Sequence, residues 1–169
     1  MSLKTFNQLA PDLASRALRN CCTSEAWIDR MRDERPFENA EVLLKSADAH
    51  WAGLTESDYL QAFEGHPKIG DVNSLREKYA ATKALAGDEQ SGVESASDNV
   101  LIALRDGNTA YEDKFGFIFI VCATGKSAAE MLALLEARLP NNREDELRNA
   151  SAEQAKITAL RLRKLISGQ

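Results

Sequence analysis

Residues that start and stop helices divide this chain along its length. Start signals are side chains that cap a helix N-terminus, or a proline in the first turn, and each precedes apolar residues at helical spacing. Stop signals are glycine and proline. Together these signals predict helices that begin at Pro11, at Thr23 or Ser24 (to about Arg35), at Asn39 (to about Trp51), at Thr55 (to Gly65), at Asn73 or Ser74, at Val93 (to Leu104), at Ser127 (to about Pro140) and at Asn142 (to about Ile166). Alternating patterns with hairpin dipeptides, the signs of paired strands, are nearly absent. The sequence therefore predicts an all-α protein.

One stretch, Phe115–Ala123, departs from the helical pattern. Its aromatic and β-branched residues suit a buried strand, but no second strand is available to pair with it. We therefore expect the stretch to be buried and partly irregular, with helix at one end. Irregular backbone N–H and C=O groups need hydrogen-bond partners. Other backbone groups are the commoner partners, and a polar planar heterocycle is the alternative.

Length and charge limit the size and the partners of this protein. A chain of 169 residues suits a single multi-helix domain, which we place at residues 1–169. The formal net charge is −5 and the pI is about 5.2, so no basic surplus exists for binding nucleic-acid phosphates or an anionic membrane surface. No apolar run is long enough to span a bilayer, and the N-terminus lacks a signal-peptide pattern. We expect a cytoplasmic protein that binds neither nucleic acid nor membranes.

The cysteines and histidines argue against a disulfide framework and a metal site. The cysteines are Cys21, Cys22 and Cys122, and they form no Cys-x-x-Cys pair. The histidines are His50 and His66, and a structural zinc site would need most of these residues together at unusual spacings. We therefore expect no bound metal.

His66 lies in a turn with strong backbone constraints. Pro67 pushes the preceding residue out of the helical region, and Gly65 is placed to end a helix whose C-terminal carbonyls favour a cationic imidazole. Such a histidine is rigidly held and titrates near neutral pH, which suits a general acid or base. A hydrogen-bonded turn histidine without a catalytic role is the commoner alternative. His50, inside a predicted helix beside Trp51, has the weaker claim to catalysis.

Arg161 interrupts an apolar row of the last predicted helix. Ile157, Arg161 and Leu165 are spaced four residues apart, so they form one ridge of that helix. We expect an arginine in this row to be half buried, and it must then meet an anion or extend toward solvent. A structural ion pair is the commoner explanation, and a carboxylate-bearing ligand held by the guanidinium is the alternative.

An acid and an amide follow Gly87 in the segment Asp88–Gly92. The plain interpretation is the first turn of a helix, where acidic residues are favourable. As chemistry, Glu89 can orient a histidine or accept a proton, and Gln90 can pair with a urea-like edge through its donor and acceptor. The spacing alone does not decide between these interpretations.

Taken together, several blocks of the sequence resemble one known family. The blocks are His66–Asp71, Glu89-Gln90 with Gly92, Asn108–Phe117 (NxxYExKFGF), Phe119–Ala123, and Glu146–Leu162 with its Glu153-Gln154-x-Lys156-Ile157 and Leu160-Arg161-Leu162 segments. In this order and spacing they are similar to the 2-oxo-4-hydroxy-4-carboxy-5-ureidoimidazoline (OHCU) decarboxylases of urate breakdown. The resemblance extends from the Phe6 region to Leu165, which is nearly the whole chain.

The resemblance implies an all-helical, cofactor-free enzyme, usually a homodimer, that converts OHCU to (S)-allantoin and CO2. The family's catalytic residues correspond to His66, Glu89 and Arg161. Its substrate contacts correspond to Pro67, Gln90 and the backbone of Phe119, Ile120, Val121, Cys122 and Ala123. No metal is implied.

Two positions depart from the family pattern. Family members often have serine three residues before the glutamate, where this chain has Ala86. Many also have proline at the position of Ile118, next to the binding backbone. We expect these departures to affect substrate affinity and to leave the catalytic residues in place.

Two other classes of function compete with the enzyme. A non-catalytic helical module that binds a small ligand through Arg161 would bind saturably without turnover and would tolerate His66→Asn. A helical protein-interaction adaptor would need a broad exposed apolar helix face, and the pattern gives no such excess.

Overall fold

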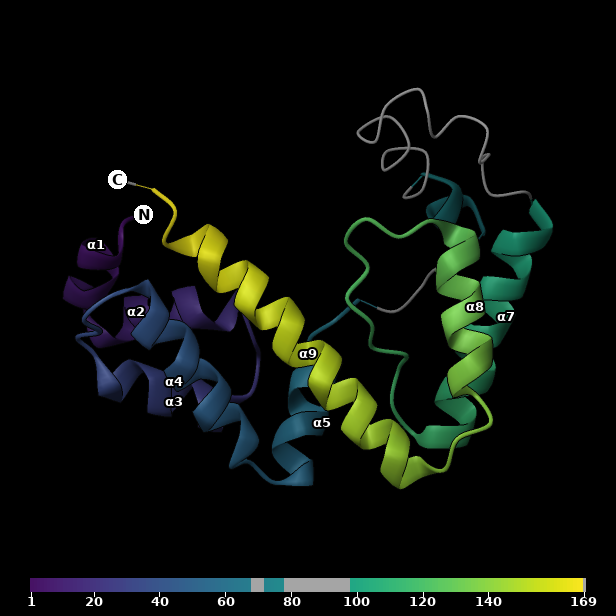
Figure 1. Ribbon diagram of the computed structural model, residues 1–169, viewed down its shortest axis with the longest axis horizontal. Helices are drawn as coiled ribbons and strands as arrows, with labels where there is room; N and C mark the ends of the chain where they lie inside the picture. The colour runs from purple at the N-terminus through teal and green to yellow at the C-terminus, as the bar shows by residue number, and fades with distance from the viewer. Residues whose placement is uncertain (68–71, 78–97, 169) are drawn as a thin grey trace. The chain divides into compact units, whose positions relative to one another are not determined.

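The computed structural model describes residues 1–67, 72–77 and 98–168, and every regular element within these ranges is a helix (Figure 1). The helices are α1 (Leu3–Gln8), α2 (Pro11–Arg19), α3 (Glu25–Glu34), α4 (Ala40–Ala52), α5 (Glu56–Glu64), α7 (Asp98–Phe115), α8 (Ala128–Arg138) and α9 (Arg143–Leu165). Residues 72–77 are also helical. In the same ranges, β-type pairing is limited to an isolated antiparallel bridge between Ser2 and Ser167. The prediction of an all-α protein is confirmed.

Contacts divide the chain into two compact units. Unit 1 comprises Met1–His66 and Ser151–Gln169, and unit 2 comprises Pro67–Ala150. The helix α9 therefore contributes its first residues to unit 2 and the remainder to unit 1. The assignment of residues 1–169 to one domain stays a prediction.

The predicted capping residues start the helices of both units. The side chains of Ser24, Asn39 and Ser127 each accept a hydrogen bond from a backbone N–H in the first turn of α3, α4 and α8. Thr55 and Asp58 form a reciprocal capping box at the start of α5. These starts were expected because each cap precedes a row of apolar residues at helical spacing.

Two elements differ from the prediction. The short helix α1 was not predicted; Ser2 caps it, and the side chain of Phe6 anchors it in the core with no exposed surface. The helix α7 was expected to end at Leu104 but continues to Phe115. Gly107 lies inside α7 and does not end the helix. A Cβ at this position would lie 2.6 Å from Cδ2 of Leu135 in α8. The missing side chain instead allows α7 and α8 to pack closely.

In unit 1, the core lies among α1, α2, α3, α4, α5 and the second part of α9. Its largest fully buried side chains are Phe6, Leu18, Trp27, Ile28, Met31, Leu43 and Phe63. The indole nitrogens of the two tryptophans are both satisfied, since Trp27 donates to the carbonyl of Ala47 and Trp51 to the carbonyl of Ser151. The second of these bonds ties α4 to α9.

In unit 2, α7 and α8 pack against each other and against the segment between them. The buried side chains are Leu101, Leu104, Tyr111, Phe115, Phe117, Phe119, Ile120, Met131 and Leu135. Tyr111 is central, with ring centroids of Phe115 and Phe119 at 4.5 and 5.2 Å. After α7 the chain has no regular structure up to Ala123, as expected for the Phe115–Ala123 stretch.

Within the described ranges, no helix combines the length and apolarity needed to cross a membrane.

Candidate active site

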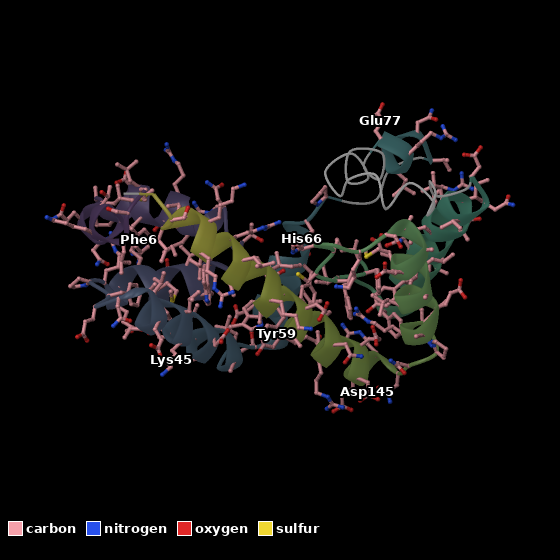
Figure 2. All side chains as sticks on the ribbon, turned by 45° about the horizontal axis from the view of Figure 1, so that its top comes forward. Phe6, Lys45, Tyr59, His66, Glu77 and Asp145 are labelled. Carbon is pink, nitrogen blue, oxygen red and sulfur yellow. The ribbon has the colours of Figure 1, made fainter. Side chains whose placement is uncertain are left out.

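His66 stands at the C-terminal end of α5, held by the backbone (Figure 2). The backbone N–H of His66 donates to the carbonyl of Phe63 at 3.1 Å. The residue before it is Gly65, and this position has no room for a side chain. A Cβ on Gly65 would lie 2.9 Å from Cβ of Thr23, with the hydroxyl of Thr23 closer still. That hydroxyl donates to the carbonyls of Gln61 and Ala62. Thr23 thus provides a hydrogen-bond donor for two carbonyl groups at the C-terminal end of α5.

The imidazole of His66 is bonded to a buried amide. Its Nε2 lies 2.6 Å from Oε1 of Gln154, and Nε2 of Gln154 donates to Oγ1 of Thr158 at 3.0 Å. With the amide in this orientation, Nε2 of His66 must carry the proton. Nδ1 then carries the free lone pair, and no described residue forms a hydrogen bond with it. A histidine in this state can accept a proton through Nδ1.

Burial lowers the pKa of His66 below its ordinary value. Desolvation is the main cause; the hydrogen bond to Gln154 acts in the opposite direction, and the positive charge of Arg161 lowers the pKa further. The expectation that helix carbonyls favour a cationic imidazole is therefore wrong. Thr23 occupies those carbonyls, and the imidazole is neutral at neutral pH.

Arg161 does not occupy the half-buried position expected of it. The buried row of α9 in unit 1 consists of Gln154, Thr158 and Leu162, whereas Arg161 is exposed. Its guanidinium makes no hydrogen bond or ion pair with any residue in the described ranges, so a structural ion pair does not account for it there. It is near enough to His66 for its charge to act on the imidazole. A cation with its donors unused beside a neutral base suits an anionic ligand.

Two buried thiols also belong to unit 1. Cys21 and Cys22 are each 2% exposed, and burial raises their pKa values to about 12 and about 11, an effect that the charge of Arg161 partly opposes. Both therefore remain neutral thiols at neutral pH. They contribute packing rather than a nucleophile.

In unit 2, the structure brings together two of the predicted substrate contacts. Pro67 and Phe119 line one cavity of about 160 Å³. Among the described residues, the cavity is also lined by Ile118 and by four side chains of α7, namely Arg105, Asn108, Thr109 and Glu112. The cavity is thus mixed in character, with an apolar side from the irregular segment and a polar side from α7.

The backbone of Phe119–Ala123 is irregular, as predicted, and some of its polar groups are already bonded. Nη1 of Arg138 donates to the carbonyl of Ile120 at 2.8 Å, and Nζ of Lys126 donates to the carbonyl of Cys122 at 2.8 Å. By contrast, the N–H and C=O groups of Phe119 and Val121 make no hydrogen bond within the described part of the chain. These groups remain available to a ligand.

The other sequence candidates divide into two groups. Glu89, Gln90 and Ala86 lie outside the described residues. His50 is bonded to Oε1 of Glu34 at 2.5 Å, and Ser46 bonds the other oxygen of the same carboxylate. His50 therefore links α4 to α3, in agreement with its weaker claim to catalysis.

Sequence reasoning did not assign a role to Gln154 or Thr158. Both are polar, so they were not expected in the buried row of α9, yet they are 1% and 6% exposed. The available signal was the Glu153-Gln154 pair inside a block that resembles the family. In the described ranges, no group of three or more His, Cys, Asp or Glu side chains is arranged to hold a metal ion.

Comparison with known proteins finds relatives along nearly the whole chain. The uric acid degradation bifunctional protein of Arabidopsis thaliana is 33% identical over 159 residues, which are 94% of this chain and 49% of that protein. A bifunctional protein from Bacillus sp. (strain TB-90) is 27% identical, and the match covers 32% of its length. The 2-oxo-4-hydroxy-4-carboxy-5-ureidoimidazoline decarboxylase of Haloferax volcanii is 24% identical over 100% of this chain and 98% of that protein. The chain thus spans half or less of the two bifunctional relatives.

Solved structures share the fold. A crystal structure of OHCU decarboxylase in the presence of (S)-allantoin matches with a TM-score of 0.73 and 34% identity, covering 89% of this chain and 96% of that chain. A crystal structure of (S)-allantoin synthase matches with a TM-score of 0.72 at 18% identity, which supports the fold alone. The family model for OHCU decarboxylase matches residues 7–163. Over these residues the chain is a member of the OHCU decarboxylase family.

Proposed function

We propose that this chain decarboxylates OHCU to (S)-allantoin and CO2, the last step in the conversion of urate to allantoin. The observation that carries the proposal is the bonding of His66, whose Nε2 is held by the buried amide of Gln154 while Nδ1 stays free. Membership of the OHCU decarboxylase family supports the choice of substrate.

The substrate itself provides the electron sink for this reaction. OHCU carries a hydroxyl and a carboxylate on one ring carbon, beside an imine-like carbon that bears the ureido group. When the bond to the carboxylate breaks, CO2 leaves and the bonding electron pair flows into the adjacent C=N. The nitrogen of that bond takes up a proton from water, and an enol-like intermediate remains. That intermediate loses its hydroxyl proton and gains a proton on the ureido-bearing carbon, from one face only. The protein must therefore orient the ring and move protons.

His66 is the base that takes the hydroxyl proton in this proposal. Because Gln154 fixes the proton on Nε2, the lone pair on Nδ1 is the acceptor. A pKa held below the ordinary value by burial keeps the imidazole neutral and ready at neutral pH. Since Gln154 fixes the tautomer, Glu89 is left to share or deliver the proton.

Arg161 is the anion-binding group of the proposed site. A tight grip on the carboxylate would stabilise the substrate more than the transition state and would slow the loss of neutral CO2. Arg161 therefore either orients the carboxylate out of the ring plane or holds the charge that develops on the ring. Gln90 positions the ureido group, Pro67 is a further substrate contact, and the backbone of Phe119–Ala123 holds the amide edges of the ring.

We further infer a cofactor-free homodimer in the cytoplasm. The chemistry above needs no external electron sink, and the family resemblance supports the dimer.

The test uses OHCU generated freshly from urate by two auxiliary enzymes, urate oxidase and the hydrolase that acts on the product of urate oxidase. Circular dichroism follows the appearance of optically active allantoin with the wild type, with His66→Ala and with His50→Ala. We expect rapid (S)-allantoin formation, a loss of about 10²–10⁴-fold in His66→Ala, and nearly full activity in His50→Ala. His50 is the matched control because it also bonds to a side chain through Nε2.

Slow, racemic product at the same rate with and without the protein would exclude the enzyme. Saturable binding of (S)-allantoin in that case would instead support the small-ligand-binding module.

A further inference from the structure

Glu146 is a carboxylate with no exposed surface in the first part of α9, within unit 2. Its Oε1 accepts from the hydroxyl of Tyr111 at 2.6 Å and from Nε of Arg138 at 2.7 Å. Its Oε2 accepts from the amides of Asn141 and Asn149 at 2.8 and 2.7 Å. Burial opposes ionisation of Glu146, but these hydrogen bonds outweigh it and hold its pKa below the usual value. The group is a fully bonded buried anion.

Arg138 links this anion to the irregular segment. While Nε bonds to Glu146, Nη1 donates to the carbonyl of Ile120 at 2.8 Å. The guanidinium carbon also lies 4.6 Å from the ring centroid of Phe119, a distance typical of a cation–π contact. The Arg138 side chain is only 12% exposed. One largely buried cation thus contacts two consecutive residues of the segment.

We infer that Arg138, held by Glu146, is a positioning residue that presets the backbone of Phe119–Val121 for its ligand. The inference rests on the proposed function, in which this backbone holds the ring of OHCU. Because Arg138 occupies the carbonyl of Ile120, a ligand must use other backbone groups of the segment, and those of Phe119 and Val121 are among the groups with no bond inside the described ranges. A segment without regular structure has no ladder to hold it, so its anchor determines how well these groups are aligned before binding.

The test compares two arginines that make similar contacts in the same unit. Arg143 donates through Nε to the carbonyl of Phe115 and lies 5.7 Å from the ring centroid of Phe117. These two partners lie outside Phe119–Ala123. Lysine keeps the charge of an arginine but loses the planar fork that reaches several partners at once. Arg138→Lys and Arg143→Lys are thus a matched pair, with Glu146→Gln as a second way to loosen Arg138.

For each variant, KM and kcat for OHCU, the dissociation constant of (S)-allantoin and the melting temperature are measured. We expect Arg138→Lys to raise KM and the dissociation constant about tenfold, the effect of one misaligned charged hydrogen bond, with kcat within about twofold. Glu146→Gln should change KM in the same direction. Arg143→Lys should lower the melting temperature while leaving both constants within about twofold of the wild type.

The inference would be overturned if Arg138→Lys and Glu146→Gln lowered the melting temperature but left KM and the dissociation constant unchanged. Arg138 would then be a structural residue. Equal increases in Arg143→Lys would do the same. Absence of turnover in the wild type would overturn the proposed function instead, and the dissociation constants for (S)-allantoin would still decide the role of Arg138. If the wild type neither turned OHCU over nor bound (S)-allantoin, both would fall.

Discussion

Nε2 of His66 and Oε1 of Gln154 lie 2.6 Å apart, although 87 residues separate them in the chain. Thr158 fixes the orientation of the Gln154 amide, and the amide in turn fixes the tautomer of the imidazole. A neutral amide holds the ring without adding charge. The histidine keeps a low pKa, which a carboxylate in the same place would raise.

Replacing Gln154 by glutamate tests this choice of partner. In Gln154→Glu the new carboxylate favours the imidazolium, so the pKa of His66 rises. The acidic limb of the pH profile of kcat/KM should then move to higher pH. Gln154→Met, which removes the bond without adding charge, should lower activity without that upward movement. An acidic limb that stays in place in Gln154→Glu would show that His66 does not control the rate.

The pH dependence of the wild type follows from the depressed pKa of His66. The neutral imidazole is the active form, so kcat/KM should stay level through neutral pH and fall only below the ordinary histidine value of about 6.5. The same shift affects folding. Its contribution to stability is fully present above the unfolded pKa and is lost as the pH falls through the folded value. Unfolding measured at pH 7 and pH 5 should show a smaller loss of stability for His66→Gln than for the wild type.

Gly65 provides the space in which α5 ends against Thr23. A methyl group at this position would lie 2.6 Å from Cγ2 and 2.9 Å from Cβ of Thr23. We expect Gly65→Ala to cost about 1–3 kcal/mol of stability and to lower kcat, because His66 follows directly. In Gly53→Ala the new Cβ would meet nothing closer than 3.6 Å, so this variant is the control. Denaturant unfolding would contradict the argument if both variants lost stability equally.

Local signals predicted the helix starts, but they could not predict which face of α9 is buried. Caps act within one turn, so Ser24, Asn39 and Thr55 could be identified without knowledge of the fold. The buried face was misassigned because two of its members, Gln154 and Thr158, are polar, whereas Ile157 and Leu165 have the expected apolar character. Buried polar residues such as these interrupt the apolar spacing from which a buried helix face is predicted, and such interruptions are expected at functional sites.

The position of Arg161 leads to a prediction that separates function from stability. Its guanidinium has no hydrogen bond or ion pair with any described residue, so Arg161→Met should change the free energy of unfolding by less than about 0.5 kcal/mol. The same variant should lose about 10²-fold or more in kcat/KM, since the guanidinium binds the ligand in the proposed site and its charge also helps to keep the imidazole of His66 neutral. Arg163 is also an exposed arginine of α9, and Arg163→Met should alter neither the free energy of unfolding nor kcat/KM. Denaturant titration and the allantoin assay on both variants provide the measurements. A large loss of stability in Arg161→Met with kcat/KM preserved would restore the structural interpretation of this arginine.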